Sequence, residues 1–205
     1  MAAMMPDLEG YFRGLAPTPD DLLIELEKEA AQEGIPIVGP VVGQLLYILA
    51  RAANAGAILE LGTATGYSAI HLARALNEKG GRVVTLEMDE AMAARARANF
   101  LTAGLQDRVE VRVGEALSLM AAMSGPFDLI FLDIDKESYA KALPLGHRLL
   151  RKGGLLVADN VGFTGADDFN RKIRAAPEWR AVHLLCFLPR HSPEQDGLSL
   201  AVKVK

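Results

Sequence analysis

Phe127-Asp-Leu-Ile-Phe-Leu-Asp133 is a short apolar run that stops on a carboxylate, and Gly154-Leu-Leu-Val-Ala-Asp159 repeats the pattern and is followed by Asn160. Apolar runs of this length are typical of strands buried in a parallel sheet that is covered on both faces. Such sheets bind ligands at the carboxyl ends of their strands. We therefore expect three oxygen-bearing side chains to meet at one edge of a sheet.

The segments around these runs alternate between strand and helix patterns from Ala57 onward. Strands are predicted at 57–61, 82–88, 108–113, 127–132 and 153–158, and helices at 66–78, 90–103, 116–123, 137–151 and 165–175. This alternation predicts an α/β fold, a doubly wound parallel sheet with helices on both faces. Two final strands, at 183–188 and 197–204, are expected to be antiparallel, and the period-two pattern of the last one is typical of an edge strand.

Two helices are predicted before the sheet, over 18–33 and 41–53. Thr18-Pro-Asp-Asp supplies an N-cap, a proline at the first helical position and early acids that suit the helix dipole. Gly34-Ile-Pro-Ile-Val-Gly-Pro separates the two helices. The whole chain, 1–205, is interpreted as one domain, with N-terminal helices at 18–53 and an α/β core at 57–205.

Composition restricts the possible partners. Hydrophobic residues make up 50% of the 205 residues, and no apolar run reaches the roughly 18 residues of a membrane span. The N-terminus lacks the regions of a signal peptide, so we expect a cytoplasmic protein with no membrane partner. With a net charge of -4, the chain lacks the excess of positive charge that is typical of proteins that bind nucleic acid. The single cysteine, Cys186, is expected to be a small buried hydrophobe.

A glycine turn, Gly62-Thr-Ala-Thr-Gly66, follows the first strand of the core, and Glu87 ends the second strand. Glycine there lets backbone N–H groups approach a ligand, and a carboxylate at this distance is placed to accept ribose hydroxyls. The spacing differs from that of dinucleotide sites. Glu60, just before the turn, would repel a phosphate but suits a cationic sulfonium or ammonium group. The pattern favours S-adenosylmethionine over NAD.

Asp133, Asp159 and Asn160 form a candidate metal site, because three oxygen ligands suit octahedral Mg²⁺ and leave about three positions for water and two vicinal substrate oxygens. Ca²⁺ and Mn²⁺ are alternatives. Lys136 lies three residues beyond Asp133 and is a candidate base for a metal-activated hydroxyl. The alternative interpretation is that Asp133 caps a helix and that Asp159 and Asn160 merely begin a loop.

The segments Glu60-Leu-Gly-Thr-Ala-Thr-Gly-Tyr-Ser, Phe131-Leu-Asp-Ile-Asp-Lys-Glu-Ser-Tyr and Ala158-Asp-Asn-Val together resemble the cation-dependent class I O-methyltransferases, the group of catechol and caffeoyl-CoA O-methyltransferases. The resemblance implies a Rossmann-like seven-stranded sheet whose last strand is inserted antiparallel, and it implies a homodimer. It assigns proton transfer to Lys136 and metal binding to the three residues named above. It assigns S-adenosylmethionine contacts to Val38, Glu60, Gly62, Thr63, Ser68, Glu87, Ala116 and Asp135.

Two segments depart from the family pattern, and both shape the pocket for the methyl acceptor. The segment after Asn160 is shorter than usual, and the loop over 189–195 is longer. The expected acceptor is therefore only a small hydroxylated molecule, with a vicinal-diol aromatic compound favoured. Three other interpretations stay open: an NAD-dependent oxidoreductase, a non-catalytic adenosine-binding module, and methylation without metal. Structural or surface roles are expected for the histidines, and only His191, in the long loop, is placed where it could face a substrate.

Overall fold

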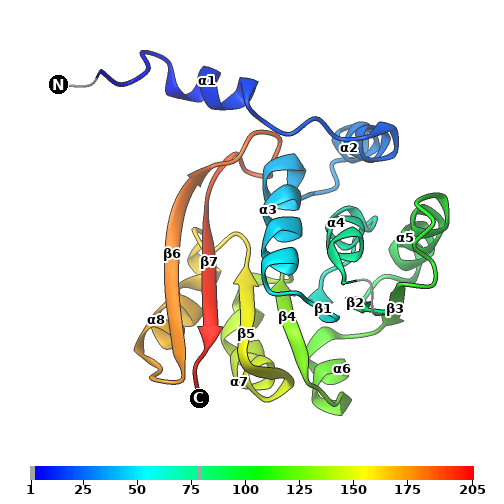
Figure 1. The fold of residues 1–205 in the computed structure, drawn as a ribbon, viewed down its shortest axis with the longest axis vertical. Coiled ribbons are helices and arrows are strands. Elements are labelled where there is room, and N and C mark those ends of the chain that lie inside the picture. The colour runs from blue at the N-terminus through cyan, green and yellow to red at the C-terminus, as the bar shows by residue number, and fades with distance from the viewer. Residues whose placement is uncertain (1–2, 78–79) are drawn as a thin grey trace.

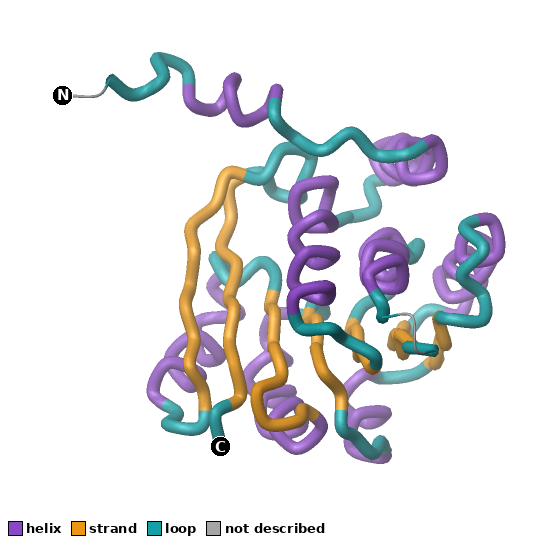
Figure 2. Tube along the Cα trace, viewed as in Figure 1, coloured by secondary structure: helices purple, strands orange, loops and turns teal. Residues whose placement is uncertain are grey.

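A seven-stranded sheet forms the centre of the computed structural model, which describes residues 3–77 and 80–205 (Figure 1). The strand order is β3-β2-β1-β4-β5-β7-β6. The strands are β1 (Ala57–Leu61), β2 (Arg82–Glu87), β3 (Val109–Val113), β4 (Phe127–Leu132), β5 (Leu150–Ala158), β6 (Trp179–Phe187) and β7 (Gln195–Lys203). The sheet runs through the molecule as one layer with helices on its two sides (Figure 2). The predicted α/β class and Rossmann-like sheet are confirmed.

Strand β7 is the only antiparallel member of the sheet within the described chain. It pairs antiparallel with β5 on one side and with β6 on the other, whereas the pairs among β1 to β5 are parallel. The prediction that 197–204 is an edge strand was wrong. The polar member of its alternation, Ser199, is 1% exposed and lies inside the sheet, and the edge strand is β6.

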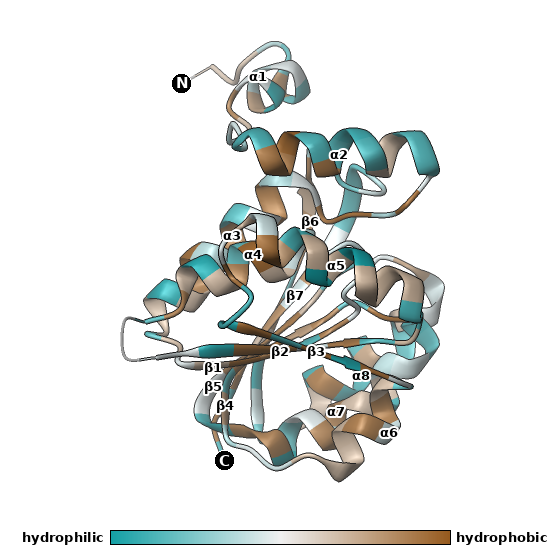
Figure 3. Ribbon diagram, turned by 90° about the vertical axis from the view of Figure 1, so that its right-hand side faces the viewer, coloured by the Kyte–Doolittle hydropathy of each residue, from teal (hydrophilic) through white to brown (hydrophobic). Residues whose placement is uncertain are grey.

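Helices cover the sheet in two layers, which Figure 3 shows on opposite sides of the strands. They are α1 (Leu8–Gly14), α2 (Asp21–Glu33), α3 (Gly39–Ala52), α4 (Tyr67–Ala75), α5 (Glu90–Thr102), α6 (Ala116–Ala122), α7 (Tyr139–Leu149) and α8 (Asp167–Ala175). Alternate strand residues enter different cores: Ile58 packs with α2 to α5, and Leu59 packs with α6 to α8. Double coverage explains why the strands are continuously apolar.

Several predicted boundaries were wrong at helix ends. α2 begins at Asp21, because Asp20 rather than Thr18 is the N-cap and accepts a hydrogen bond from Leu23 N at 3.0 Å. The predicted end of the helix over 66–78 lies partly outside the described residues, and α4 ends at Ala75. A short 3-10 helix, Lys136–Ser138, precedes α7 where one continuous helix was expected.

The N-terminal helix α1 was not predicted, and it extends away from the sheet in Figure 1. It contains no buried residue, and Phe12 is 53% exposed. Arg13 ties the helix to Glu194, in the loop between β6 and β7, with two hydrogen bonds of 2.7 Å. A search of the described residues finds no helix with the length and hydropathy of a membrane span.

Candidate functional site

A cavity of about 390 Å³ lies at the carboxyl ends of β1, β2, β4 and β5. Its walls include the ends of four strands, the start of α6, the segment before α3 and the loop between β6 and β7. Eight predicted site residues line it: Gly62, Glu87, Ala116, Asp133, Asp135, Lys136, Asp159 and Asn160. The fold therefore brings four of the eight expected cofactor residues, the three expected metal residues and Lys136 to one cavity.

The glycine turn between β1 and α4 is shaped by close packing as well as by the cavity. Gly62 has φ +96°, and a Cβ at this position would collide with the carbonyl oxygen of Asp133 at the end of β4. Gly66 has φ +88°, and a Cβ there would meet the ring of Phe100. Both glycines hold a backbone conformation that residues with a side chain rarely adopt. Gly62 is thus the point where the turn touches the segment that bears Asp133.

Glu87 joins the end of β2 to this turn. Its Oε2 accepts hydrogen bonds from the backbone N–H groups of Thr63, at 3.2 Å, and Ala64, at 2.8 Å. Its Oε1 accepts one from Asp89 N at 3.0 Å. The carboxylate has about four lone-pair positions, so one of them, on Oε1, is left for a ligand in the cavity. Glu87 therefore organises the turn and also faces the cavity.

Four predicted cofactor residues are buried and do not line the cavity: Val38, Glu60, Thr63 and Ser68. Glu60 Oε2 accepts a hydrogen bond of 2.6 Å from the Thr85 hydroxyl, while Glu60 Oε1 has no partner. The pKa of Glu60 is raised to about 7, mainly by burial, with a smaller contribution from the charges of Asp133 and Glu87, and the hydroxyls of Thr85 and Ser68 oppose the rise. A cationic group beside Oε1 would relieve this repulsion.

Asp159 and Asn160 follow β5 and are nearly inaccessible to solvent, at 0% and 8% exposure. The chain turns at Asn160, which has φ +49°, a conformation that asparagine tolerates. The Asp159 carboxylate accepts the Asn160 backbone N–H at 2.9 Å. Burial and this turn do not match the interpretation of the two residues as the start of an ordinary surface loop.

Asp133 lies opposite, after β4, and its Oδ1 accepts a hydrogen bond of 2.8 Å from Lys136 Nζ. It does not cap α7, whose N-cap is Ser138. Burial raises the pKa of Asp133, and the neighbouring Asp159 charge raises it further, although Lys136 opposes the shift. The side chain of Asp133 is 25% exposed and Asp159 is fully buried, and two carboxylates that repel each other at such a site favour a bound cation. Lys136 Nζ also lies 5.4 Å from the centre of the Tyr139 ring.

His191 lies against Asp159 and was predicted only as a residue that faces a substrate. Its Nε2 is 2.8 Å from Asp159 Oδ2, and its Nδ1 is 2.6 Å from the carbonyl oxygen of Pro193. Burial lowers the pKa of His191, but the hydrogen bond and charge of Asp159 raise it by more, and the net shift is upward. His191 lines the same cavity, so that prediction agrees with its position.

Asp196 was not predicted as a site residue. It is 4% exposed, and its Oδ2 accepts a hydrogen bond of 2.6 Å from Asn160 Nδ2. The sequence signal was only its place in an Asp-Gly-Leu triplet near the last strand. Pro36 and Ile37, before α3, also line the cavity and replace Val38, which is 3% exposed, as the wall on that side.

The donor set fits a hard divalent cation. Asn160 Nδ2 is occupied by Asp196 and by the Ser192 carbonyl oxygen at 3.2 Å, so the amide oxygen is the group left to bind a cation. Together with two carboxylates it forms an all-oxygen set, which suits Mg²⁺, Ca²⁺ or Mn²⁺. No cluster of three or more His, Cys, Asp or Glu side chains that could hold a metal occurs among residues 3–77 and 80–205.

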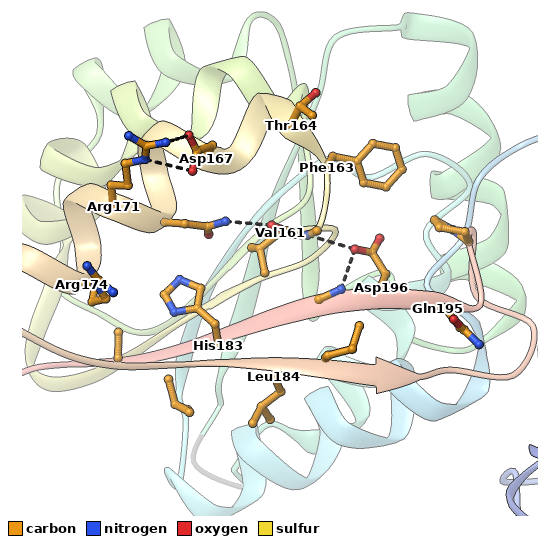
Figure 4. A pocket seen from close by; sticks show the side chains of 17 residues that line it. Val161, Phe163, Thr164, Asp167, Arg171, Arg174, His183, Leu184, Gln195 and Asp196 are labelled. Atoms are coloured by element: carbon orange, nitrogen blue, oxygen red, sulfur yellow. Dashed lines mark hydrogen bonds and ion pairs between the residues drawn. The ribbon is translucent and has the colours of Figure 1, made fainter. Parts of the chain in front are cut away.

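A larger hollow of about 1210 Å³ lies between α8 and the edge strand β6 (Figure 4). His183, Arg174 and the Arg171–Asp167 ion pair lie along it. Asp196 lies at one end, with its hydrogen bonds to the backbone drawn. The hollow contains none of the predicted site residues.

Cys186, expected to be buried, is only partly buried in β6.

Comparison with known proteins agrees with this geometry. The profile of a family described as O-methyltransferase matches residues 16–177. The chain belongs to the O-methyltransferase family. It is 42% identical to a catechol O-methyltransferase of Niastella koreensis over 215 aligned positions, which cover 95% of this chain and 96% of that protein. This relative is similar to the present O-methyltransferase over almost its whole length.

Two solved structures are also similar to this O-methyltransferase. The O-methyltransferase from Bacillus cereus in complex with SAH superposes with a TM-score of 0.85 at 34% identity, with 96% of each chain covered. TomG from Streptomyces achromogenes, in complex with SAM, gives a TM-score of 0.86 at 29% identity, with 98% of this chain and 100% of TomG covered. The predicted family and enzyme class, an S-adenosylmethionine-dependent O-methyltransferase, are confirmed.

Proposed function

We propose that this O-methyltransferase uses a divalent metal ion, Mg²⁺ by preference, to methylate one hydroxyl of a small acceptor with two vicinal oxygens, with an aromatic diol favoured. The observation that carries the proposal is the single cavity that joins the glycine turn and Glu87 to Asp133, Asp159, Asn160 and Lys136. Catechol, the substrate in the name of the Niastella koreensis relative, is the first acceptor to test. The NAD-dependent alternative has no support from the family assignment.

The methyl donor is proposed to lie along the turn, Glu87 and Ala116. The free position on Glu87 Oε1 accepts a ribose hydroxyl, and Ala116 lies beside the adenine. The unpartnered Glu60 Oε1 suits the ammonium group of the methionine part. Val38 and Thr63 support this pocket from behind, Ser68 serves the methionine carboxylate as the family resemblance implies, and Asp135 contacts the cofactor at the cavity wall.

The acceptor is proposed to lie on the metal side of the cavity. A divalent cation held by Asp133, Asp159 and Asn160 would lower the pKa of a hydroxyl bound to it. Lys136, whose Nζ lies 2.8 Å from Asp133 Oδ1, would take the hydroxyl proton in its neutral form, the only form with a lone pair on Nζ. The cavity walls align the acceptor oxygen with the donated methyl group, and such alignment provides much of the rate in bimolecular transfer.

Calorimetry and a methylation assay test the function together. The protein is expected to bind S-adenosylmethionine and SAH, to methylate catechol in the presence of Mg²⁺, and to lose that activity in EDTA and regain it on addition of Mg²⁺. Absence of cofactor binding would refute the donor site. Turnover that EDTA does not change would refute the metal role, and cofactor binding with no turnover on any diol or monophenol would support a non-catalytic adenosine-binding module.

Three further proposals come from the sequence. The chain is proposed to be one domain, because a single sheet runs through it and both helical layers pack on that sheet. It is proposed to form a homodimer, which would cover the exposed apolar side chains of α1. A cytoplasmic location is the third, and fractionation of the cells that produce the protein tests it.

A further inference from the structure

The two metal-site residues after β5 are each held by a side chain from the segment that leads into β7. Asp196, at the start of that strand, contacts Asn160, and His191, in the preceding loop, contacts Asp159. All four side chains are buried, with exposures between 0% and 8%. Neither of these two contacts is explained by hydrophobic packing, and buried polar networks of this kind are costly unless they are satisfied.

The Asp196 carboxylate is held by two backbone N–H groups as well as by Asn160. Its Oδ1 accepts hydrogen bonds from the backbone N–H groups of Gly162, at 3.1 Å, and Gly197. Its Oδ2 is then directed at Asn160 Nδ2, at 2.6 Å. Because a carboxylate only accepts hydrogen bonds, it can hold the amide of Asn160 in one orientation only, with the NH₂ group toward Asp196.

This orientation decides what Asn160 offers to the cavity. The second hydrogen of its NH₂ group is directed at the Ser192 carbonyl oxygen, at 3.2 Å. The amide oxygen is therefore free for a cation, whereas a flipped amide would present hydrogens that repel one. Asp196 selects the metal-binding orientation of Asn160 without being a ligand itself.

His191 restrains the other residue of the pair in a similar way. Its ring is fixed at Nδ1 by the Pro193 carbonyl oxygen, at 2.6 Å, and its Nε2 lies 2.8 Å from Asp159 Oδ2. Asp159 Oδ1 accepts the Asn160 backbone N–H at 2.9 Å. The carboxylate is thus held at both oxygens, which fixes the direction of its remaining lone pairs.

We propose that Asp196 and His191 are positioning residues for the metal site, which orient Asn160 and Asp159 and so raise the affinity for a divalent cation. The proposal rests on the metal dependence put forward above. Partners of this kind change metal affinity by roughly 10- to 100-fold in characterised metal sites. They are expected to leave the affinity for SAH unchanged, because neither side chain contacts the glycine turn or Glu87.

The first test is Asp196→Asn, which keeps the shape of the side chain. Its amide oxygen can still accept the two backbone N–H groups, but its NH₂ group would then face the NH₂ group of Asn160. Relief of this donor–donor contact requires Asn160 to flip, which turns hydrogens toward the cation. We expect Mn²⁺ affinity, measured from the EPR signal of free Mn²⁺, to fall by roughly 10- to 100-fold. Asp168→Asn, on the exposed face of α8, is the matched control.

The second test compares His191→Leu with His191→Gln. Leucine removes the contact with Asp159, whereas glutamine keeps an N–H donor and is expected to restore part of the Mn²⁺ affinity. His183→Leu, on the neighbouring strand β6, is the control. Calorimetry with SAH shows whether each variant keeps the donor pocket, and the side-chain amide ¹⁵N–¹H signals of Asn160 report its orientation in the metal-free protein.

The outcomes separate this proposal from the proposed function. If the unmodified protein binds no Mn²⁺, the metal role itself fails, and the positioning role fails with it. If the unmodified protein binds Mn²⁺ and Asp196→Asn and His191→Leu bind it equally well, only the positioning role is wrong. Loss of SAH binding together with Mn²⁺ binding would also overturn it, because the residues would then support the fold as a whole.

Discussion

The two halves of the cavity are built in different ways. On the donor side, β1, β2 and the glycine turn are fixed mainly by backbone groups, with Thr63 N and Ala64 N bonded to Glu87. On the metal side, β4 and β5 end in side chains, and those side chains are held by other side chains from a loop more than 30 positions away along the chain.

This difference means that the two halves respond to substitution differently. The turn depends on its glycines and on one side chain, Glu87, and is expected to tolerate changes in the other neighbouring side chains. A side-chain network depends on each member, since the loss of one partner leaves another buried polar group unsatisfied. The donor half is therefore expected to persist when the metal half is disrupted, and the following experiments test that asymmetry.

Asp159→Ala is expected to have the largest effect, and on the metal half alone. It removes one of the three proposed oxygen ligands, so metal-dependent turnover should fall by roughly 10³-fold, which corresponds to the several kcal/mol that a metal ion supplies. Calorimetry should find SAH affinity nearly unchanged. If SAH binding is lost together with turnover, the two halves are not independent and the metal site is misassigned.

Lys136→Met is expected to slow transfer while leaving both halves formed. Loss of a general base typically lowers kcat by about 10²- to 10⁴-fold. The residual rate should rise with pH more steeply than in the unmodified enzyme, because the acceptor hydroxyl must then ionise without the base. Lys141→Met, on the exposed side of α7, is the control. An unchanged kcat in Lys136→Met would exclude the lysine from proton transfer.

Gly62→Ala tests the point where the two halves touch. The new Cβ would have to adopt φ +96° and would collide with the Asp133 carbonyl oxygen. The left-handed conformation and the clash together should lower the free energy of unfolding by about 3 kcal/mol. Gly104→Ala, with φ +67° and no atom within 4 Å of the added Cβ, should show only the smaller conformational cost. Equal losses in urea unfolding would mean that the contact with Asp133 carries no strain.

Two buried titratable groups on the donor half, His71 and Glu60, are expected to make the stability of the fold depend on pH. The pKa of His71, in α4, is lowered to about 4, mainly by burial and also by the charge of Arg74, while Asp20 opposes the shift. Because an exposed histidine in the unfolded chain titrates near 6.5, His71 destabilises the fold as pH falls from 6.5 to 4. Glu60 has the opposite sign: its pKa is raised from 4.5 to about 7, so its contribution to stability is lost as pH rises through that window.

Urea unfolding of His71→Leu and Glu60→Gln at several pH values tests the direction in which each group changes stability with pH. His71→Leu should lose less stability on acidification than the unmodified protein, by up to a few kcal/mol. Glu60→Gln should lose more, because it lacks the group that offsets the histidine. Parallel stability profiles for all three proteins would show that neither group is perturbed in the folded state.

Sequence alone predicted most of the sheet, because buried parallel strands leave an unambiguous apolar pattern. The period-two pattern alone misplaced the last strand at the edge, since Ser199 is buried, whereas the family resemblance correctly implied an inserted antiparallel strand. Helix α1, which has an N-cap in Asp7 but no apolar stripe that packs on the core, was also not predicted. Where tertiary contacts decide burial, composition along the strand is a weak guide.

The candidate site also contains residues that the sequence predicted and residues that it did not predict. Asp133, Asp159 and Asn160 were predicted because they directly follow strands, so topology alone brings them together. Asp196 and the contact of His191 with Asp159 were not predicted, since these contacts depend on how the loop before β7 and the start of β7 pack over the end of β5. A pattern along the chain contains no information on which buried carboxylate meets which amide.

The insertion of β7 between β5 and β6 has a consequence for the order of events during synthesis. β6 leaves the ribosome before β7, yet it pairs with β7 and is separated from β5 by it, so it must wait for that strand before it can join the sheet. The same late segment delivers His191 and Asp196. A growing chain can thus form the proposed methyl-donor pocket before the residues that hold the proposed metal site have been synthesised.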